Sequence, residues 1–392
     1  MVQLRDDPKA MSGNKLLVCL PYLTPSIGGG AMALLNLLEP LADEGFDIGV
    51  VHFQEPAGAL IPPRFRRRFL PKRVGRTRYY LEYPGTILRL ARIVHEENPD
   101  FILCNSYQPY WLALAARALA RSRARIVTGE LNNLSEMFRG AKLGRLRAWL
   151  TRRLDPLADK IVVHNRGMAG HIEDFCSVPE NRLFVVPIPI PAARVTLLSK
   201  EPIDHPWFAP GSPPVILNVG VLDPQKDQAT LLRAFALLRG KRPLRCLIVG
   251  EGPLREALTA EARRLGVEQD VSLPGFDRNP YRYMARAAVF ALSSAYEGGF
   301  GMVVAEALAC GCPVASTDCP YGPSDILRQD GRPPAGLLSP VGDPAALAEN
   351  MERLLDDKAL RASLVSRGRE RALDFEPSAI AALYARELRS LA

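Results

Sequence analysis

The sequence lacks any apolar run that approaches the roughly 18 residues a membrane-spanning helix requires. Its first apolar stretch, residues 16–22, is too short for the core of a signal peptide and predicts a buried strand instead. The sequence therefore predicts a cytoplasmic protein without a spanning helix.

Cysteine and metal-ligand patterns are equally scarce. The seven cysteines are scattered, and the only close pair, Cys310 and Cys312, lacks the second pair that a zinc site needs. We expect seven reduced thiols in a reducing compartment, with no metal and no bound cofactor.

What the chain does contain is typical of a globular protein with two domains. Its 392 residues are 47% hydrophobic and 23% charged, and this length exceeds what one core usually organises. The charge is uneven: residues 1–200 hold 28 Lys and Arg against 18 Asp and Glu, whereas the remainder holds 22 against 24. This asymmetry predicts an anionic partner for the first half.

Short apolar segments alternate with helical periodicity along most of the chain, which predicts α/β architecture with parallel sheets covered by helices. A proline-rich stretch at residues 187–214 separates two such series and predicts a linker. We predict a first domain at residues 1–195, a second at 196–375 and a terminal helix at 376–392. The strands expected are 15–20, 48–53, 101–104, 126–128, 160–164, 183–187, 215–219, 245–249, 271–273, 289–292 and 313–316.

Residues 297–327 are the most informative segment. Glu297 and Glu306 bracket a glycine-rich turn that opens a short helix, and Gly311 and Pro313 are typical of that helix's end. In an open α/β sheet, ligands bind beyond the carboxyl ends of the strands. Free glycine amides there suit anionic oxygens, and carboxylates accept hydrogen bonds from sugar hydroxyls. The segment predicts a pocket for a ligand with both phosphate and sugar.

Four motifs carry a resemblance to a known family, in the order Leu217 to Asp227, Leu247 to Pro253, Gly275 to Pro280 and Glu297 to Leu327. Together they resemble the donor-site signature of retaining glycosyltransferases of family 4, among them enzymes of capsular and cell-envelope polysaccharide synthesis. The resemblance covers most of residues 213–375, and it implies the GT-B fold: two Rossmann-like domains facing a central cleft. It also implies that the terminal helix crosses back onto the first domain.

The resemblance assigns roles to particular residues. Lys226 matches the lysine that binds the leaving diphosphate, Glu306 the carboxylate that holds the ribose, and Glu297 the carboxylate that faces the donor sugar. A solvated turn lysine and a solvated helix glutamate remain the plain alternatives. The other implied contacts are backbone amides at Gly299, Phe300 and Gly301 for the sugar, Asn279 near the base, Asp318, Gly322 and Ser324 for phosphate or sugar, and the acceptor-side loop of Gly28, Gly29 and Gly30.

Three positions depart from the family pattern. Eight residues separate Glu297 from Glu306 where the family has seven, so a glycine must bulge or Glu297 is displaced. Val221 stands where the family has an arginine, and losing one charged donor could cost about 2–4 kcal/mol of transition-state stabilisation. Leu131 stands at the expected place of a first-domain histidine, with His164 as a weak candidate to replace it. Reduced or lost activity is therefore an open alternative.

Two stretches of the first half are strongly basic. Residues Arg64 to Arg78 hold eight basic side chains and no acid, and Arg139 to Arg153 combine arginines with leucines and Trp149. We expect both stretches to contact an anionic membrane. The second predicts a basic amphipathic helix, a pattern typical of such contact, with a solvated helix packed on the core as the alternative. No stacking or recognition motif favours nucleic acid.

Taken with the resemblance, these features predict a retaining hexosyltransferase. It would move a sugar from a nucleotide-sugar donor, uridine-linked by expectation, to a lipid-linked or cell-envelope glycan at the inner face of the membrane. Since the chain has no Asp-x-Asp, we expect metal-independent chemistry. The alternatives are a catalytically weakened GT-B protein that binds nucleotide or glycan as a partner subunit, and a sugar-nucleotide epimerase, which lacks supporting residues.

Overall fold

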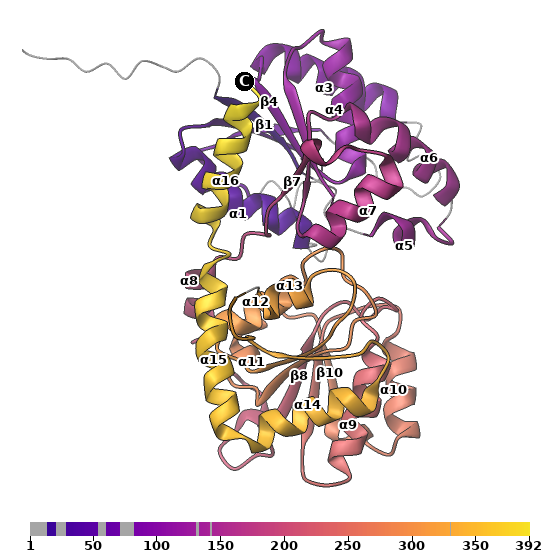
Figure 1. The fold of residues 1–392 in the computed structure, drawn as a ribbon, viewed down its shortest axis with the longest axis vertical. Helices are drawn as coiled ribbons and strands as arrows, with labels where there is room; N and C mark the ends of the chain where they lie inside the picture. The colour runs from indigo at the N-terminus through magenta and orange to yellow at the C-terminus, as the bar shows by residue number, and fades with distance from the viewer. Residues whose placement is uncertain are drawn as a thin grey trace, which may run out of the picture.

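The fold consists of two parallel-sheet domains, as the sequence predicts (Figure 1). It is taken from a computed structural model that describes residues 14–20, 29–53, 60–70, 82–130, 133–141, 143–329 and 331–392. The predicted contributions of Gly28, Leu131, Lys142 and residues 71–78 lie outside these described residues.

The first domain is built on a seven-stranded sheet in the order β3-β2-β1-β4-β5-β6-β7, with every neighbouring pair parallel. Strand order reverses between β1 and β4, which makes a doubly wound sheet with its ligand-binding end at the strands' carboxyl termini. The strands are β1 (Lys15–Cys19), β2 (Asp47–His52), β3 (Arg66–Phe69), β4 (Phe101–Asn105), β5 (Arg125–Gly129), β6 (Lys160–Val163) and β7 (Leu183–Val185).

The second domain repeats this architecture with six parallel strands in the order β10-β9-β8-β11-β12-β13. Its reversal point lies between β8 and β11. The strands are β8 (Val215–Val219), β9 (Arg245–Val249), β10 (Val271–Gly275), β11 (Val289–Leu292), β12 (Val314–Thr317) and β13 (Leu337–Ser339).

Helices cover both faces of each sheet and leave four apolar clusters between the layers. Five of the described helices were not predicted: those at residues 134–138, 192–198, 323–327, 344–356 and 358–373. The first three hold too few turns to show an apolar period. The helices are α1 (Gly29–Asp43), α3 (Tyr83–Glu97), α4 (Tyr107–Leu119), α5 (Leu134–Phe138), α6 (Gly144–Leu154), α7 (Arg166–Cys176), α8 (Ala192–Leu198), α9 (Gln228–Arg239), α10 (Arg255–Arg264), α11 (Tyr281–Met284), α12 (Met302–Ala309), α13 (Pro323–Leu327), α14 (Pro344–Asp356), α15 (Lys358–Leu373) and α16 (Pro377–Ser390).

The chain passes between the domains twice, and the two passages lie side by side. At the first, the Ile190 amide donates to the Phe375 carbonyl at 2.7 Å, so the linker is tied to the start of the return passage. The predicted boundary at 195/196 falls within α8, whose Ala192 and Val195 already pack in the second-domain core. After Phe375, α16 runs back along the first domain and packs on α1 (Figure 1). Its buried face consists of Ile380, Ala381, Tyr384, Ala385 and Leu388.

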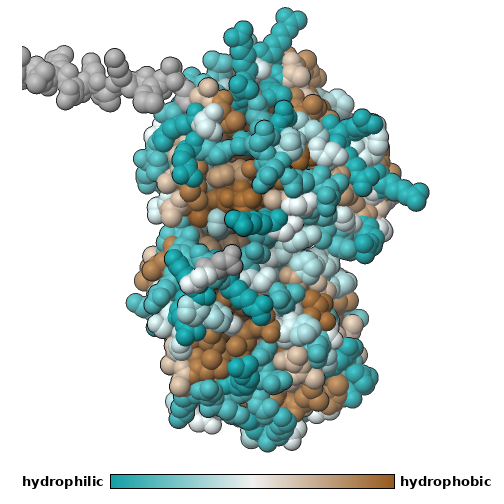
Figure 2. Space-filling view, viewed as in Figure 1, coloured by the Kyte–Doolittle hydropathy of each residue, from teal (hydrophilic) through white to brown (hydrophobic). Residues whose placement is uncertain are grey.

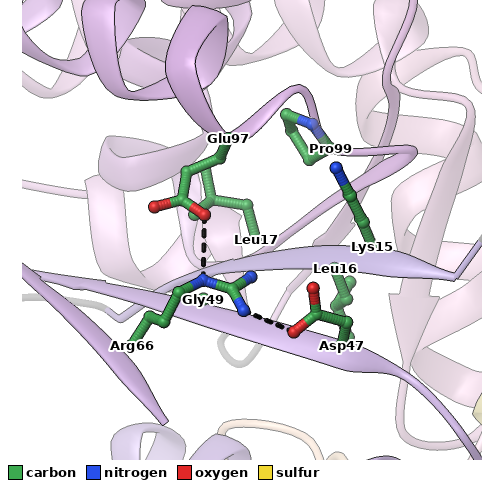
Figure 3. A pocket seen from close by; sticks show the side chains of 8 residues that line it. All are labelled: Lys15, Leu16, Leu17, Asp47, Gly49, Arg66, Glu97 and Pro99. Carbon is green, nitrogen blue, oxygen red and sulfur yellow. Dashed lines mark hydrogen bonds and ion pairs between the residues drawn. The ribbon is translucent and has the colours of Figure 1, made fainter.

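Strand β3 lies within the stretch interpreted from sequence as a basic surface. Its arginines face carboxylates: Arg66 pairs with Asp47 at 2.5 Å and with Glu97 at 3.1 Å, and Arg68 pairs with Glu97 at 2.8 Å. Figure 3 shows the Arg66 cluster in a shallow depression at the amino ends of β1, β2 and β3. This is the end of the sheet opposite the expected ligand site, so the depression is a structural ion-pair cluster.

The described residues bear on the expectations for membrane spans, metal ligands and cysteines. Within the described ranges, no helix has both the length and the apolar character needed to span a bilayer. The same residues bring no three His, Cys, Asp or Glu side chains together in a way that could hold a metal ion. All seven cysteines are free and buried.

A buried acidic pair lies inside the first domain. The Asp155 side chain is fully buried and accepts a hydrogen bond from the Cys176 thiol at 3.4 Å. Burial raises the pKa of Asp155 to about 7, and burial together with Asp155 raises the pKa of Glu130 well above its usual range. A carboxyl group that holds its proton in the folded state makes stability fall as pH rises from the unfolded to the folded pKa.

We therefore expect Asp155→Asn to flatten the pH dependence of unfolding. Between about pH 4 and pH 7 the parent protein should lose stability with rising pH, with a slope of at most about 1.4 kcal/mol per pH unit from this group. The variant should lose that component, whereas exposed Asp204→Asn should keep it. Urea unfolding at several pH values measures the difference, and parallel curves for parent and Asp155→Asn would contradict the assignment.

Candidate functional site

The loops that follow β8 and β11 bring two opposite charges together at the reversal point of the second sheet. Lys226 lies in the loop between β8 and α9, and Glu297 lies in the loop between β11 and α12. The Lys226 Nζ is 2.6 Å from Glu297 Oε1, and the two side chains are only 15% and 5% exposed. The carboxyl-end crevice of the sheet thus holds the charged pair that the sequence motifs predict as site residues.

Hydrogen bonds hold both residues in place. The Ser294 hydroxyl donates to Glu297 Oε1 at 2.6 Å, and the Ser293 hydroxyl donates to the Lys226 carbonyl at 3.0 Å. The Thr317 hydroxyl on β12 donates to the Ser294 carbonyl at 2.7 Å. Three neighbouring strands therefore support one constellation, and such preorganisation is what electrostatic catalysis requires.

Glu306 lies on α12, the helix that follows the loop containing Glu297. The Tyr281 hydroxyl donates to Glu306 Oε1 at 3.1 Å. Burial raises the pKa of Glu306 to about 7, a change that the hydrogen bond from Tyr281 opposes. The carboxyl group can therefore change charge near neutral pH.

The turn between the two glutamates uses left-handed glycine conformations. Gly299 has φ +126° and Gly301, the residue before α12, has φ +73°. A side chain at Gly299 would overlap the Met168 sulfur, so only glycine fits there. The turn accommodates the long spacing while Glu297 stays beside Lys226. Phe300 turns its ring into the core, where it meets Phe375 edge-on at 5.0 Å, so only its backbone is available to a ligand.

The first domain contacts this turn directly. Asn165, which caps α7, donates from Nδ2 to the Gly299 carbonyl at 2.5 Å while its Oδ1 accepts from the Met168 amide at 2.8 Å. Tyr321 packs against the first-domain core, with its ring 6.0 Å from that of His171. In Figure 1, α12 and α13 lie on the side of the second domain that faces the first. The candidate site therefore borders the interface between the domains.

Other predicted residues fall into structural positions. Asn279 donates to the Leu198 carbonyl at 3.0 Å and to Glu201 at 2.8 Å, so it ties the linker to the second domain, and its contact with a base stays a prediction. Gly322 precedes α13, and Ser324 lies in that helix's first turn. Gly29 and Gly30 begin α1, where the Gly30 carbonyl accepts from Asn105 at 2.9 Å.

The departures from the motif pattern are visible in part. Val221 is 47% exposed, and its backbone carbonyl accepts a hydrogen bond from Gln228. Because its side chain is aliphatic, it offers an anion no hydrogen-bond donor. His164 is buried, with Nδ1 3.0 Å from the Val186 carbonyl. Burial lowers the pKa of His164 to about 4, so its imidazole is neutral at neutral pH.

Several site residues escaped the sequence analysis. Ser294, Tyr281 and Tyr321 have no local signal, because their contacts join segments that are distant in the chain. Asn165 had one: an asparagine directly before a predicted helix is a common cap. Its bond to Gly299 nevertheless depends on how the domains meet.

The close contact between Gly322 and the Phe300 backbone leads to a prediction. Its φ is +126°, and a Cβ there would lie 2.5 Å from the Phe300 carbonyl group, so Gly322→Ala must push aside the turn between Glu297 and Glu306, called the donor turn below after its expected ligand. We expect a loss of roughly 1–3 kcal/mol in unfolding free energy, together with weaker nucleotide binding. Gly342→Ala is the matched control, since Gly342 also has positive φ but faces open space. Equal binding by both variants would contradict the packing argument.

Comparison with known proteins agrees with this geometry. The family models "Glycosyltransferase Family 4" and "Glycosyl transferases group 1" match residues 27–194 and 199–371. The chain is 29% identical over 90% of its length, and 94% of the relative's, to N-acetylgalactosamine-N,N'-diacetylbacillosaminyl-diphospho-undecaprenol 4-alpha-N-acetylgalactosaminyltransferase of Campylobacter jejuni. It is 30% identical to the lipopolysaccharide core biosynthesis glycosyltransferase LpsE of Rhizobium meliloti, over 72% of this chain and 73% of that one.

Solved structures share the fold. HepE of Anabaena, in complex with UDP and glucose, superposes with a TM-score of 0.76 at 20% identity, over 96% of this chain and 99% of that one. A glycosyltransferase from Rickettsia africae superposes with a TM-score of 0.78 at 14% identity, over 97% and 99%. Because family models match both halves, a relative is 30% identical over 73% of its length, and the folds agree, the chain belongs to the GT-B glycosyltransferases.

Proposed function

We propose that this glycosyltransferase moves a hexose from a uridine-linked nucleotide sugar to a lipid-linked or cell-envelope glycan, with retention of configuration and without a metal ion. The observation that carries the proposal is the Lys226–Glu297 pair, 2.6 Å apart and largely buried at the reversal point of the second sheet. Such a site offers one fixed positive charge beside one fixed acceptor, which suits a ligand with both diphosphate and sugar.

Lys226 has the charge and the position to stabilise the departing diphosphate. When the bond from the anomeric carbon to the phosphate oxygen breaks, negative charge grows on that oxygen, and an aimed ammonium group lowers the barrier. Glu297 accepts hydrogen bonds from sugar hydroxyls on the other side of the lysine. In the retaining reaction, the acceptor oxygen bonds to the anomeric carbon on the face that the diphosphate leaves, and the hydroxyl proton passes to the departing phosphate.

Relatives support the proposed donor and acceptor classes. HepE was solved with UDP and glucose, which supports a uridine-linked donor for this chain. The Campylobacter jejuni relative is named for a diphospho-undecaprenol acceptor and an alpha linkage, and LpsE for lipopolysaccharide core biosynthesis. A retaining enzyme with an α-linked donor makes an alpha linkage. The lack of Asp-x-Asp supports metal independence.

Membrane contact belongs to this proposal through the second basic stretch. In the first stretch, the described Arg64, Arg66 and Arg68 pair with carboxylates, which lowers their value for an anionic surface. In the second, Arg145 and Arg153 are exposed and have no carboxylate partner among the described residues. Helix α6 is therefore the part of the surface that we propose meets the membrane.

Binding is tested first by calorimetric titration with UDP in the presence of a chelator. We expect micromolar affinity that is lost in Glu306→Ala, because a buried carboxylate bonded to the ribose contributes roughly 1.5–3 kcal/mol per charged hydrogen bond. GDP and ADP serve as controls for the base. If none of the three nucleotides binds, the exposed Val221 in place of an arginine favours the alternative function, a non-catalytic partner subunit.

The pKa of Glu306 gives a second prediction. Ribose hydroxyls donate best to the ionised carboxylate, and this form is lost as pH falls through about 7. The affinity for UDP-glucose should then drop below pH 7 by at most about tenfold per pH unit, while Glu306→Gln stays flat. UDP-glucose is preferred to UDP here because a terminal phosphate itself titrates near pH ~6. Identical pH profiles would remove Glu306 from the ribose site.

Catalysis is tested with labelled UDP-sugars and a diphospho-undecaprenol-linked acceptor. Transfer with retained configuration should occur with EDTA present and should fall by roughly 100-fold or more in Lys226→Met, since removing one aimed donor commonly costs that much in kcat. Release of free sugar alone, or interconversion of free UDP-sugars, would contradict transfer to the lipid-linked glycan.

A further inference from the structure

We propose that a pocket beneath α6 takes the hydrocarbon tail of a phosphate-bearing membrane lipid. The inference rests on the proposed lipid-linked acceptor and adds a binding site for its tail. The pocket has a volume of about 500 Å³ and lies between α3, α4 and α6 in the first domain. This volume falls in the range of small-molecule sites.

The lining of the pocket is apolar. Of the described residues that line it, seven are aliphatic or aromatic and Arg147 is the only charged one: Tyr83, Ile87, Trp111, Leu112, Leu143, Leu146, Arg147 and Leu150. A nucleotide or a free sugar would lose its hydrogen bonds to water there, whereas a hydrocarbon chain loses none. The lining therefore selects an apolar ligand segment.

Helix α6 covers the pocket loosely. Only Gly144 and Thr151 of its residues are buried, and it packs on α5 and α7. Leu143 and Leu146 line the pocket and are each 49% exposed, so the pocket opens to the surface along this edge. An apolar pocket with an exposed apolar rim is a common mark of a lipid or partner site.

The surface around this opening carries the arginines and the exposed tryptophan of α6, which suit a lipid with a negatively charged headgroup. Helix α6 holds four arginines and no acid, and Arg145 and Arg153 are exposed, as is Trp149 at 55%. Tryptophan and arginine beside exposed leucines are typical of the bilayer interface, where the phosphate groups lie. Figure 2, drawn from the same side as Figure 1, shows hydrophilic side chains over most of the visible surface, with apolar side chains in limited patches.

The position of the pocket relative to the donor site is suitable for this role. Helix α6 packs on α7, and Asn165, which caps α7, donates to the Gly299 carbonyl of the second domain. A lipid held under α6 would present its phosphate-linked glycan on the side of the first domain where the donor turn lies. The proposal thus explains how a membrane lipid reaches a site that needs no spanning helix.

Tryptophan quenching separates pocket binding from surface adsorption. The chain has three tryptophans, so pairwise Trp→Phe changes leave Trp111, Trp149 or Trp207 as the single reporter. Vesicles of phosphatidylcholine and phosphatidylglycerol with brominated chains are then titrated into each full-length protein. We expect quenching of Trp111 in the pocket and of Trp149 on α6, and none of Trp207 in the second domain.

Two adjacent residues of α3 provide matched variants. Ile87 lines the pocket, whereas neighbouring Leu88 is 62% exposed and does not. In the Trp111 reporter, Ile87→Asn should weaken quenching roughly tenfold, the equivalent of about two buried methylene groups, and Leu88→Asn should leave it unchanged. Thermal unfolding confirms that both variants fold.

The outcomes are distinct. Quenching of Trp149 without Trp111 would show adsorption of α6 on the surface and would overturn the pocket, as would equal effects of Ile87→Asn and Leu88→Asn. Protection by glycerol phosphate, which has a headgroup but no chain, would also overturn it. Because the readout needs neither UDP nor turnover, failure of the proposed transferase activity leaves this result unaffected.

Discussion

The ion pair between Lys226 and Glu297 determines how the donor side of the molecule is put together. Two opposite charges that are almost fully buried must remain paired, since removing either partner leaves the other uncompensated at a cost of about 3–5 kcal/mol. The pair therefore fixes the loop after β8 against the loop after β11. The Glu297 amide in turn donates to the Pro320 carbonyl at 2.6 Å, which positions the loop after β12. The Lys226–Glu297 pair and the Glu297–Pro320 hydrogen bond thus hold the loops after β8, β11 and β12 together.

The same turn transmits that shape to the first domain. Gly299 follows Glu297 closely, and its carbonyl accepts the Asn165 hydrogen bond that crosses between the domains. The two passages of the chain, joined at Ile190 and Phe375, lie together, and α16 packs on α1. A change in the angle between the domains would therefore displace the donor turn directly, through the Asn165–Gly299 hydrogen bond. This arrangement suits the proposed transfer, in which one domain would bind the donor and the other the acceptor.

The structure separates the two basic stretches of the first domain by what their arginines contact. Much of the basic stretch around β3 serves the fold, because Arg66 and Arg68 neutralise Glu97 and neighbouring acids at the amino ends of the strands. Helix α6 differs because its exposed Arg145 and Arg153 have no carboxylate partner among the described residues and lie beside exposed leucines and a tryptophan. Sequence composition could not separate these two stretches, since both read as basic. Their difference lies in what each packs against.

The sequence by itself determined the architecture and the main site residues. Alternating apolar segments and helical periods predict two parallel sheets, and the motifs around Lys226, Glu297 and Glu306 predict a donor site that the structure gathers in part. Strand β3 was missed because its residues, Arg66 to Phe69, have no apolar alternation and pair only as an edge. The tertiary structure alone decided the long-range contacts: Ser294 and Tyr281 on the glutamates, Asn165 on Gly299, and the pocket under α6. The physical reason is that periodicity and turn chemistry act between neighbours in the chain, whereas these contacts arise only when separate elements pack.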